Sequence, residues 1–104
     1  MKKTLSIIIP VYNEEDTIGE LLRRVFAETL TGWQKQVIVV DDGSTDGTRD
    51  RLAAWRKKCK IIVLEKNQGK GAAVAVGFER ARGAIVLIQD ADLEYNPQEY
   101  PSLI

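Results

Sequence analysis

The stretch Ser6-Ile7-Ile8-Ile9-Pro10-Val11-Tyr12-Asn13-Glu14-Glu15 joins a short apolar run to polar and acidic residues. The same pattern returns in Val37-Ile38-Val39-Val40-Asp41-Asp42-Gly43-Ser44 and in Ala84-Ile85-Val86-Leu87-Ile88-Gln89-Asp90-Ala91-Asp92. Short apolar runs bounded by turn residues are typical of buried parallel strands. Ligands of open α/β sheets bind at the carboxyl ends of such strands. Acidic residues at that edge therefore indicate a site that holds a metal ion together with a phosphorylated ligand.

The apolar runs predict a sheet of four parallel strands. The strands are expected at residues 6–11, 36–40, 60–64 and 84–88. Helical patterns follow the first three strands, which predicts one α/β unit with right-handed crossovers and helices on both faces. If the strands lie in the order 3-2-1-4, the chain direction reverses between the first and the fourth. That order brings residues 10–12 beside residues 89–92, with Asp41 and Asp42 one strand away, so the acidic loops border one crevice.

Helices are expected behind the first three strands. The first begins with Asn13 as its N-cap and carries acidic residues in its first turn, where the helix dipole favours negative charge. Its apolar stripe recurs at helical spacing and consists of Ile18, Leu21, Leu22, Val25 and Phe26. The second helix is expected over residues 45–58, where it buries Leu52 and Trp55. The third follows Gly69-Lys70-Gly71.

The last residues indicate that the domain continues. Pro97 suits the first turn of a further helix, and the sequence ends at Ile104 soon after that helix begins. A chain of 104 residues is at most one domain, and a small one for an enzyme with two substrates. Residues 1–104 are therefore expected to form the N-terminal part of a longer domain.

The composition excludes several classes of function. Lys and Arg number 15 and Asp and Glu also number 15, so no net positive charge would recruit nucleic acid. The chain contains no histidine, which excludes histidine-dependent nucleophiles, bases and metal sites within it. A bound metal ion would need oxygen ligands, which favours Mg²⁺, Mn²⁺ or Ca²⁺ over Zn²⁺.

Cysteine content and hydropathy bear on the cellular compartment. The single Cys59 cannot form an internal disulfide, which fits a reducing cytoplasm. No residues that would activate a thiol accompany Cys59, so we do not expect it to be reactive. The longest apolar stretch is about five residues, whereas a membrane-spanning helix needs about twenty. The sequence leaves open whether a longer protein carries a membrane anchor elsewhere.

Asp90 and Asp92 form an Asp-x-Asp pair at the end of the fourth predicted strand. If the extended conformation persists, both side chains face the same side. Two carboxylates about 5–6 Å apart repel by roughly 3 kcal/mol at an effective dielectric constant near 20, and a divalent cation turns that repulsion into binding. Mg²⁺ or Mn²⁺ takes one or two carboxylates together with substrate phosphates. We therefore favour metal binding, with Glu94 as a third acidic ligand, over a solvated loop.

The segment Asp41–Gly47 is open to more than one interpretation. It resembles an EF-hand loop, but Ala53 stands at the twelfth position, where a bidentate Glu is required. One remaining interpretation is a carboxylate that accepts hydrogen bonds from the base or ribose of a nucleotide. The other is an Asx-turn and helix cap formed by Ser44, Thr45 or Asp46.

Two further features have a structural and a functional interpretation. Gly69-Lys70-Gly71 opens a helix after a strand, as a phosphate-binding turn would. Because it matches neither the dinucleotide nor the P-loop fingerprint, a tight turn with a solvated Lys70 is favoured. Tyr12 could stack on a nucleotide base or be a partly buried aromatic at a strand end. Trp33 and Trp55 are assigned to packing.

Four motifs in order closely resemble the family 2 glycosyltransferases with the GT-A fold. They are Ile8-Ile9-Pro10-Val11-Tyr12-Asn13-Glu14, Val39-Val40-Asp41-Asp42-Gly43-Ser44-x-Asp46-Gly47-Thr48, Asn67-x-Gly69-Lys70-Gly71 and Gln89-Asp90-Ala91-Asp92-Leu93-Glu94-Tyr95. The most similar branch looks like the dolichyl- or polyprenyl-phosphate mannose and glucose synthases. The resemblance covers nearly the whole chain and implies a Rossmann-like, nucleotide-sugar-binding half.

The resemblance implies a nucleotide-diphosphate sugar in the crevice, with Mg²⁺ or Mn²⁺ bound across its pyrophosphate. The residues implied around the nucleoside are Pro10, Tyr12, Glu14, Val40 and Asp42. Those implied at the ribose, metal and phosphates are Asp90, Ala91 and Asp92, of which Asp90 and Asp92 hold the metal. Asp41 is a weaker candidate for contact with the base.

The resemblance leaves the catalytic residues unknown, because the acceptor-binding half would follow Ile104. Ala75 stands where the family commonly has a basic residue, and Asn96 where it commonly has Asp. The full-length protein would transfer a hexose from UDP or GDP, with inversion, to a polyprenyl or dolichyl phosphate at the cytoplasmic face of a membrane. The chain of 104 residues would be incomplete for catalysis. An exposed sheet edge could pair with a second copy as a homodimer.

Three alternatives differ in class. A nucleotide-sugar-binding module without turnover fits the same motifs. A receiver-type phosphoacceptor domain would have its acid pair after the first strand and its phosphorylated Asp after the third, where this chain has Asn13-Glu14-Glu15 and Lys66-Asn67. A nucleotidyltransferase would carry a Gly-rich basic loop after the first strand. The sequence does not distinguish UDP from GDP, nor one sugar or acceptor from another.

Overall fold

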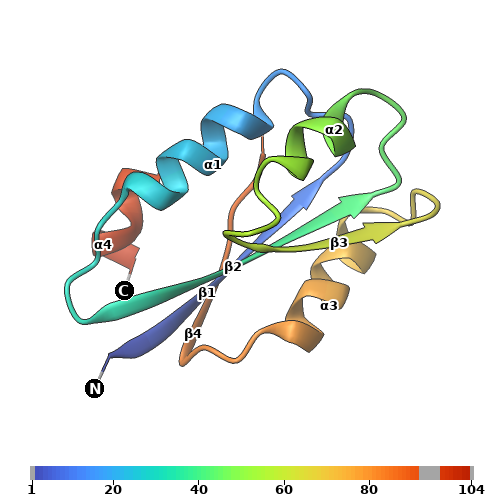
Figure 1. Ribbon diagram of the computed structural model, residues 1–104. Helices are drawn as coiled ribbons and strands as arrows, with labels where there is room; N and C mark the ends of the chain where they lie inside the picture. Colours follow the sequence, from blue (N-terminus) through green and yellow to red (C-terminus); the bar gives the residue numbers. More distant parts are fainter. Residues whose placement is uncertain (1, 92–96, 104) are drawn as a thin grey trace.

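A four-stranded parallel sheet forms the centre of the molecule, in the order β3-β2-β1-β4. The computed structural model describes residues 2–91 and 97–103. The elements are β1 (Lys3–Val11), α1 (Ile18–Ala27), β2 (Trp33–Asp42), α2 (Thr48–Ala53), β3 (Lys60–Leu64), α3 (Lys70–Arg80), β4 (Ile85–Ile88), the 3₁₀ turn η1 (Pro97–Glu99) and α4 (Tyr100–Leu103). The predicted α/β class and strand order are confirmed (Figure 1).

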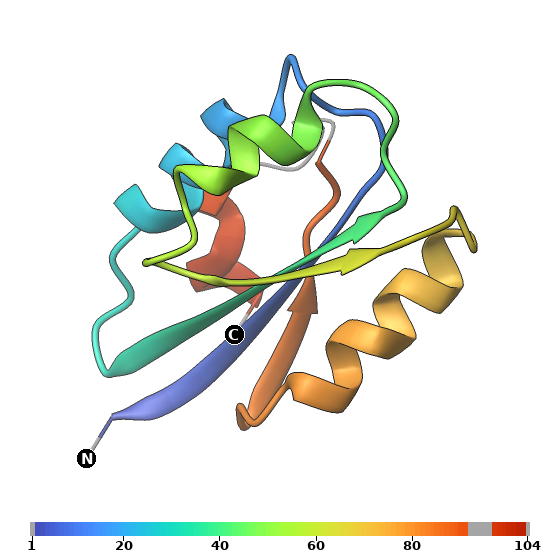
Figure 2. The same ribbon diagram turned by 45° about the vertical axis from the view of Figure 1, so that its right-hand side comes forward.

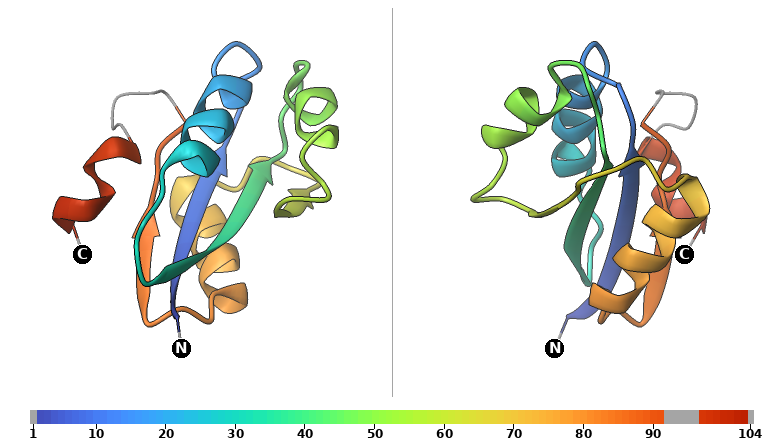
Figure 3. Two further views of the ribbon diagram at one scale, coloured as in Figure 1. Left: turned by 60° about the vertical axis from the view of Figure 1, so that its left-hand side comes forward. Right: turned by 90° about the vertical axis from the view of Figure 1, so that its right-hand side faces the viewer.

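Helices cover both faces of the sheet. α1 and α2 lie on one face and α3 lies on the other (Figure 2). The two views in Figure 3 show the same layers from the side. η1 and α4 lie beside α1, and Tyr100 joins the core on that face. The first two crossovers therefore run over one face and the third runs over the other, as right-handed connections in this strand order require.

Side-chain alternation along β1 and β2 builds the two cores. The larger core, on the face of α1 and α2, contains Leu5, Ile7, Ile9 and Val11 of β1 together with the apolar stripe of α1. The smaller core, on the face of α3, contains Ile38, Val40 and Ala73. Because consecutive strand residues face opposite sides, neighbouring residues at the end of β2 also face opposite sides. This alternation decides which loop each acidic residue reaches.

Several predicted boundaries are wrong. β1 and β2 are longer than expected, beginning at Lys3 and Trp33. α1 begins at Ile18, with Thr17 as its N-cap residue, so Asn13 does not cap it. Asn13 instead has a positive φ of 51° and bonds to the loop that follows β2. A long-range contact thus replaces the local cap.

α2 is also shorter than predicted, because its regular hydrogen bonding ends at Ala53. Beyond it, Trp55 donates from its amide to Leu52 at 2.9 Å, and Lys58 donates to Trp55 at 2.9 Å, both with three-residue spacing. The Trp55 ring stacks on Phe26 of α1, with 5.6 Å between ring centroids. The predicted packing role of Trp55 is confirmed, because it packs as a partly buried residue against the larger core.

Among the described helices, none is long and apolar enough to cross a bilayer.

α3 approaches the sheet closely because it has small residues on its inner side. Ala73 and Gly77 are its buried positions. A methyl group at Gly77 would lie 2.5 Å from Cγ2 of Ile8, a fully buried residue of the central strand β1. Ile8 cannot move aside easily, since its neighbours fill the space around it.

The close approach predicts that Gly77→Ala destabilises the chain. We expect a loss of about 1–3 kcal/mol in the free energy of unfolding, because the added methyl overpacks the core. Gly71→Ala is the matched control on the same helix, since a methyl there meets nothing within 4 Å. Urea unfolding should show Gly71→Ala at or above wild-type stability. Equal stability of the two variants would contradict the packing of α3 on β1.

Candidate functional site

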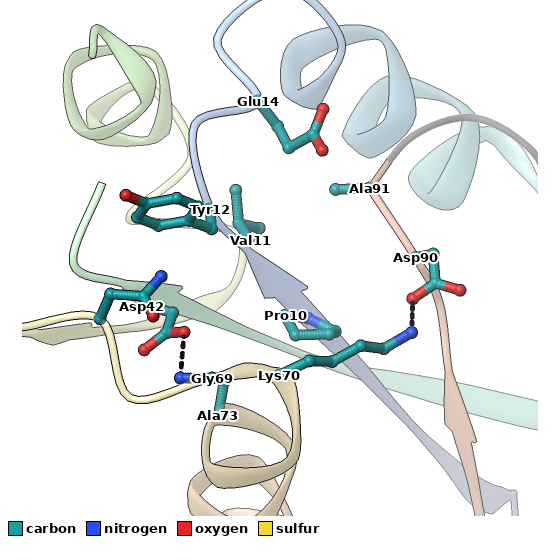
Figure 4. Close-up of a pocket in the computed structure, with 11 residues that line it drawn as sticks. Pro10, Val11, Tyr12, Glu14, Asp42, Gly69, Lys70, Ala73, Asp90 and Ala91 are labelled. Carbon is teal, nitrogen blue, oxygen red and sulfur yellow. Dashed lines mark hydrogen bonds and ion pairs between the residues drawn. The ribbon is translucent and has the colours of Figure 1, made fainter. Parts of the chain in front are cut away.

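A crevice of about 550 Å³ opens at the carboxyl edge of the sheet, between the loops that follow β1, β2, β3 and β4. Its size lies in the range of small-molecule sites. The predicted site residues that line it are Pro10, Tyr12, Glu14, Asp42, Asp90 and Ala91. Figure 4 shows that they come from separate strand ends and surround one space. The reversal between β1 and β4 therefore gathers these predicted residues into one crevice.

Val40, which was also predicted at the site, does not line the crevice. Val40 is fully buried in the smaller core, where it packs with Ala73 and pairs in register with Pro10. It thus supports the crevice through two lining residues. Asp92 lies outside the described residues, as does Glu94.

The loop after β1 is fixed by the loop after β2. Asn13 donates its amide to Oγ of Ser44 at 2.9 Å, and its side-chain Oδ1 accepts from the amide of Thr45 at 2.8 Å. Oγ1 of Thr48 accepts from the amide of Glu14 at 2.9 Å and donates to Asp46 at 2.6 Å. These contacts hold the backbone of Glu14 at the rim of the crevice.

Asp41 at the end of β2 faces the α2 side and is fully buried. Its Oδ1 accepts from the amide of Ser44 at 3.1 Å, and its Oδ2 pairs with Nε of Arg49 at 2.9 Å. The side chain of Asp41 thus closes this turn, whereas the predicted Asx-turn lies at Asp46, whose Oδ1 accepts from the amide of Thr48 at 2.9 Å. Asp41 therefore secures the loop after β2, and it does not line the crevice.

Asp42 faces the α3 side and binds the loop that leads into α3. Its two carboxylate oxygens accept from the amides of Gln68 at 2.7 Å and Gly69 at 2.9 Å. Its neighbour Gly43 has φ of 73°, and a methyl there would lie 2.5 Å from the amide nitrogen of Asn67. A carboxylate offers about four acceptor positions, so Asp42 can hold this loop and still accept from a ligand.

Lys70 lines the crevice, a position that sequence reasoning did not assign to it. We expected it to be solvated, but its ammonium pairs with the carboxylate of Asp90 across the crevice (Figure 4). Lys70 begins α3 and Asp90 follows β4, so no local sequence pattern links them. The Gly69-Lys70-Gly71 turn was the available sequence signal, because it starts a helix directly after a strand, as phosphate-binding turns do.

The remaining walls are fixed differently. The Thr17 hydroxyl lies 2.7 Å from the carbonyl oxygen of Ala91 and 3.0 Å from Oε2 of Glu14, both of which can accept from it. It thereby ties the loop after β4 to the start of α1. The crevice is open to solvent beside Tyr12, since this residue is 44% exposed. An exposed aromatic ring at the mouth of a crevice can stack on a flat ligand.

The described residues meet part of the requirement of a divalent cation. Asp90 lines the crevice, and its carboxylate already pairs with the ammonium of Lys70. Within residues 2–91 and 97–103, no three acidic or thiol side chains converge on one point. Mg²⁺ and Mn²⁺ are commonly held by one or two carboxylates plus substrate phosphates. Among the described residues, Asp90 is therefore a carboxylate that such a cation could share with a phosphorylated ligand.

Cys59 lies at the opposite end of the sheet, immediately before β3. Burial raises the pKa of its thiol from 9.0 to about 11. Its sulfur lies 3.4 Å from the carbonyl oxygen of Trp55, a hydrogen-bond acceptor. A thiol with such a high pKa is a poor nucleophile near neutral pH, in keeping with the expectation from sequence.

The two amide contacts of Asp42 predict the effect of Asp42→Asn. The variant keeps one acceptor oxygen and turns an NH₂ donor toward the second amide, which costs about 1–3 kcal/mol at this buried position. We expect that loss in urea unfolding, together with faster amide exchange at Gln68 or Gly69. Asp50→Asn, on the exposed surface of α2, is the charge-matched control. Equal losses in the two variants would contradict this role of Asp42.

Comparison with known proteins gives concordant results. The family model described as Glycosyl transferase family 2 matches residues 6–104. Undecaprenyl-phosphate 4-deoxy-4-formamido-L-arabinose transferase of Pseudomonas paraeruginosa is 43% identical over 105 residues, which cover 96% of this chain and 31% of the relative. The chain thus spans about a third of the length of the curated relatives it matches.

Solved structures share the fold. The mannosyltransferase PcManGT from Pyrobaculum calidifontis, in complex with GDP-Man and Mn²⁺, superposes with a TM-score of 0.83 at 27% identity, over 98% of this chain and 31% of that one. TarS from S. aureus, in complex with UDP-GlcNAc, gives 0.81 at 36% identity, over 98% and 29%. With a parallel 3-2-1-4 sheet, a crevice at its switch point and a family match over residues 6–104, the chain belongs to glycosyl transferase family 2 and has the Rossmann-like arrangement of the GT-A fold.

Proposed function

We propose that this chain is the donor-binding part of a glycosyltransferase that uses a UDP- or GDP-linked sugar. The observation that carries the proposal is the crevice at the β1–β4 switch point, into which the Asp90 carboxylate opens. The exposed ring of Tyr12 stands across it. A flat base, a ribose and a charged diphosphate need these two kinds of surface in one place.

In this proposal each part of the donor meets a different wall. The base stacks on Tyr12, and Pro10 and Asp42 line the space next to it. Glu14 stands at the rim, where its carboxylate can accept a hydrogen bond from a nucleoside hydroxyl. Val40 does not contact the donor in this proposal. It lies behind the crevice wall, where it pairs in register with Pro10 and packs with Ala73. The diphosphate lies toward Asp90 and Ala91.

Asp90 and Asp92 would hold Mg²⁺ or Mn²⁺ against the diphosphate. The ion supplies charge neutralisation for the departing nucleoside diphosphate. The chain itself orients the donor, because the loops after β1, β2 and β3 are fixed by hydrogen bonds to one another. Fixed positioning contributes much of the rate enhancement of such transfers.

The acceptor in this proposal is a polyprenyl phosphate, the class of lipid that the names of the relatives contain. A phosphate monoester is largely ionised near neutral pH, its second pKa being about 6, so its oxygen needs little help from a base. That oxygen attacks the anomeric carbon as the bond to the nucleoside diphosphate breaks, which inverts the configuration. The chain spans about a third of the length of these relatives, so in this proposal the rest of the protein orients the acceptor and this chain alone would transfer little or no sugar.

The proposal includes a location and an assembly. A polyprenyl-phosphate acceptor resides in a membrane, so the whole protein would work at its cytoplasmic face. β3 and β4 are the edge strands of the sheet, and either edge could pair with a second copy to give a homodimer.

Thermal unfolding in the presence of candidate donors tests the proposal. UDP-glucose or GDP-mannose with Mn²⁺ should raise Tm, and NAD with Mn²⁺ should not. At a ligand concentration ten times Kd the stabilisation is about 1.4 kcal/mol, which corresponds to a rise of roughly 5–10 °C for a domain of this size. EDTA should remove most of the rise, because the metal bridges protein and diphosphate.

The matched variants separate the site from general charge effects. The double variant Asp90→Ala, Asp92→Ala should lose the metal-dependent rise in Tm. Asp50→Ala, Glu79→Ala removes the same charge from exposed positions of α2 and α3 and should keep it. A full metal-dependent rise in the Asp90 and Asp92 variant would rule out this metal site, and no rise with either donor in the wild type would contradict the proposed function.

A further inference from the structure

An ion pair between Lys70 and Asp90 crosses the crevice from α3 to the end of β4 (Figure 4). The Lys70 side chain is 60% exposed and that of Asp90 is 29% exposed. The pair therefore stands in contact with solvent, where a ligand can reach both partners. It also occupies the carboxylate that the proposed function assigns to a metal ion.

The backbone of Lys70 is placed by Asp42. Gly69, the residue before it, adopts φ of 100°, and its amide donates to Asp42 at 2.9 Å. The amide of Gln68 donates to the same carboxylate. The start of α3 is thus fixed, and the long side chain of Lys70 is the part that can change partner.

The backbone of Asp90 is placed from the other side. Gln89 donates its amide to the carbonyl of Ile8 at 2.9 Å, and its side-chain Oε1 accepts from the Tyr100 hydroxyl at 2.9 Å. Thr17 lies within hydrogen-bond distance of the carbonyl of Ala91. Both ends of the ion pair therefore stand on anchored backbone, which keeps the two side chains facing each other across the opening.

We propose that Lys70 is a cation placeholder for the metal site: it pairs with Asp90 until donor binding, and then turns its ammonium to the donor diphosphate while Asp90 passes to the metal ion. The exchange conserves charge pairing at every stage. Asp90 is matched by an ammonium before binding and by a divalent ion afterwards. The diphosphate meets both cations. Lys70 is thus a positioning residue for donor and metal, and the inference rests on the proposed function.

The exchange has a thermodynamic consequence. A metal ion that arrives alone must displace Lys70 from Asp90, and the displaced ammonium has no diphosphate to receive it. A donor that arrives with the metal offers Lys70 new phosphate oxygens. Lys70 therefore weakens binding of the metal alone and strengthens binding of the nucleotide, so it increases the coupling between the two ligands, which by linkage is the same in both directions.

Replacement of Lys70 by methionine tests this inference through two affinities that should move in opposite directions. Lys70→Met should bind Mn²⁺ alone about two- to fivefold more tightly than wild type, the range that a partly exposed ion pair supplies. With EDTA present, it should bind UDP or GDP about tenfold more weakly, because a charged donor to the diphosphate is lost. Whichever of UDP and GDP stabilises the wild type in thermal unfolding is the nucleotide used for this measurement. Electron paramagnetic resonance of free Mn²⁺ and isothermal calorimetry measure the two affinities.

Two further variants serve as controls. Lys66→Met removes the same charge from an exposed position in the same loop and should change neither affinity by more than about twofold. Lys70→Arg keeps a cation at the position and should stay closer to wild type than Lys70→Met in both measurements. A merely structural role of Lys70 would move both affinities in the same direction.

The outcomes separate this inference from the proposed function. If the wild type binds nucleotide with Mn²⁺ but Lys70→Met has unchanged affinities, the placeholder role is wrong and the proposed function stands. The placeholder role is equally wrong if Lys66→Met reproduces the effects of Lys70→Met. If the wild type binds neither UDP nor GDP with Mn²⁺, the proposed function and the placeholder role both fail.

Discussion

Two adjacent buried carboxylates at the end of β2 hold the crevice in shape. Because side chains alternate along a strand, Asp41 turns to the loop before α2 and Asp42 to the loop before α3. One strand end thereby fixes two neighbouring loops, one on each face of the sheet. A buried carboxylate is costly without partners, so these loops cannot move away without leaving a charge unpaired. The wall of the crevice on the β2 and β3 side follows from this constraint.

The architecture was accessible from the sequence because it depends on patterns that repeat within a segment. Apolar runs of strand length predicted β1, β2, β3 and β4, and the stripe from Ile18 to Phe26 predicted α1. The parallel order then follows from the helices between the strands and from the handedness of crossovers. Once the order is known, the strand ends must share one edge, and this is how the crevice with Tyr12, Asp42 and Asp90 could be predicted.

The rest depends on contacts between segments far apart in the chain. Asn13 has the residue type of a helix cap, but the loop after β2 offered its side chain two backbone amides, so α1 begins four residues later, after Thr17. Lys70 had no sign of a partner until α3 and β4 were placed in space. In both cases a residue type compatible with a local role took a long-range one, and only the tertiary structure distinguishes the two.

The central claim is that a nucleotide and a divalent ion bind together beside Asp90. Paramagnetic broadening by Mn²⁺ tests it directly on the ¹⁵N-labelled chain in the presence of UDP or GDP. The account predicts that amide signals of Lys70, Asp90 and Ala91 broaden first, while those of Lys35 and Arg82, at the amino end of the strands, stay sharp. Broadening that begins at Lys35 and Arg82, or that ignores the nucleotide, would contradict the account.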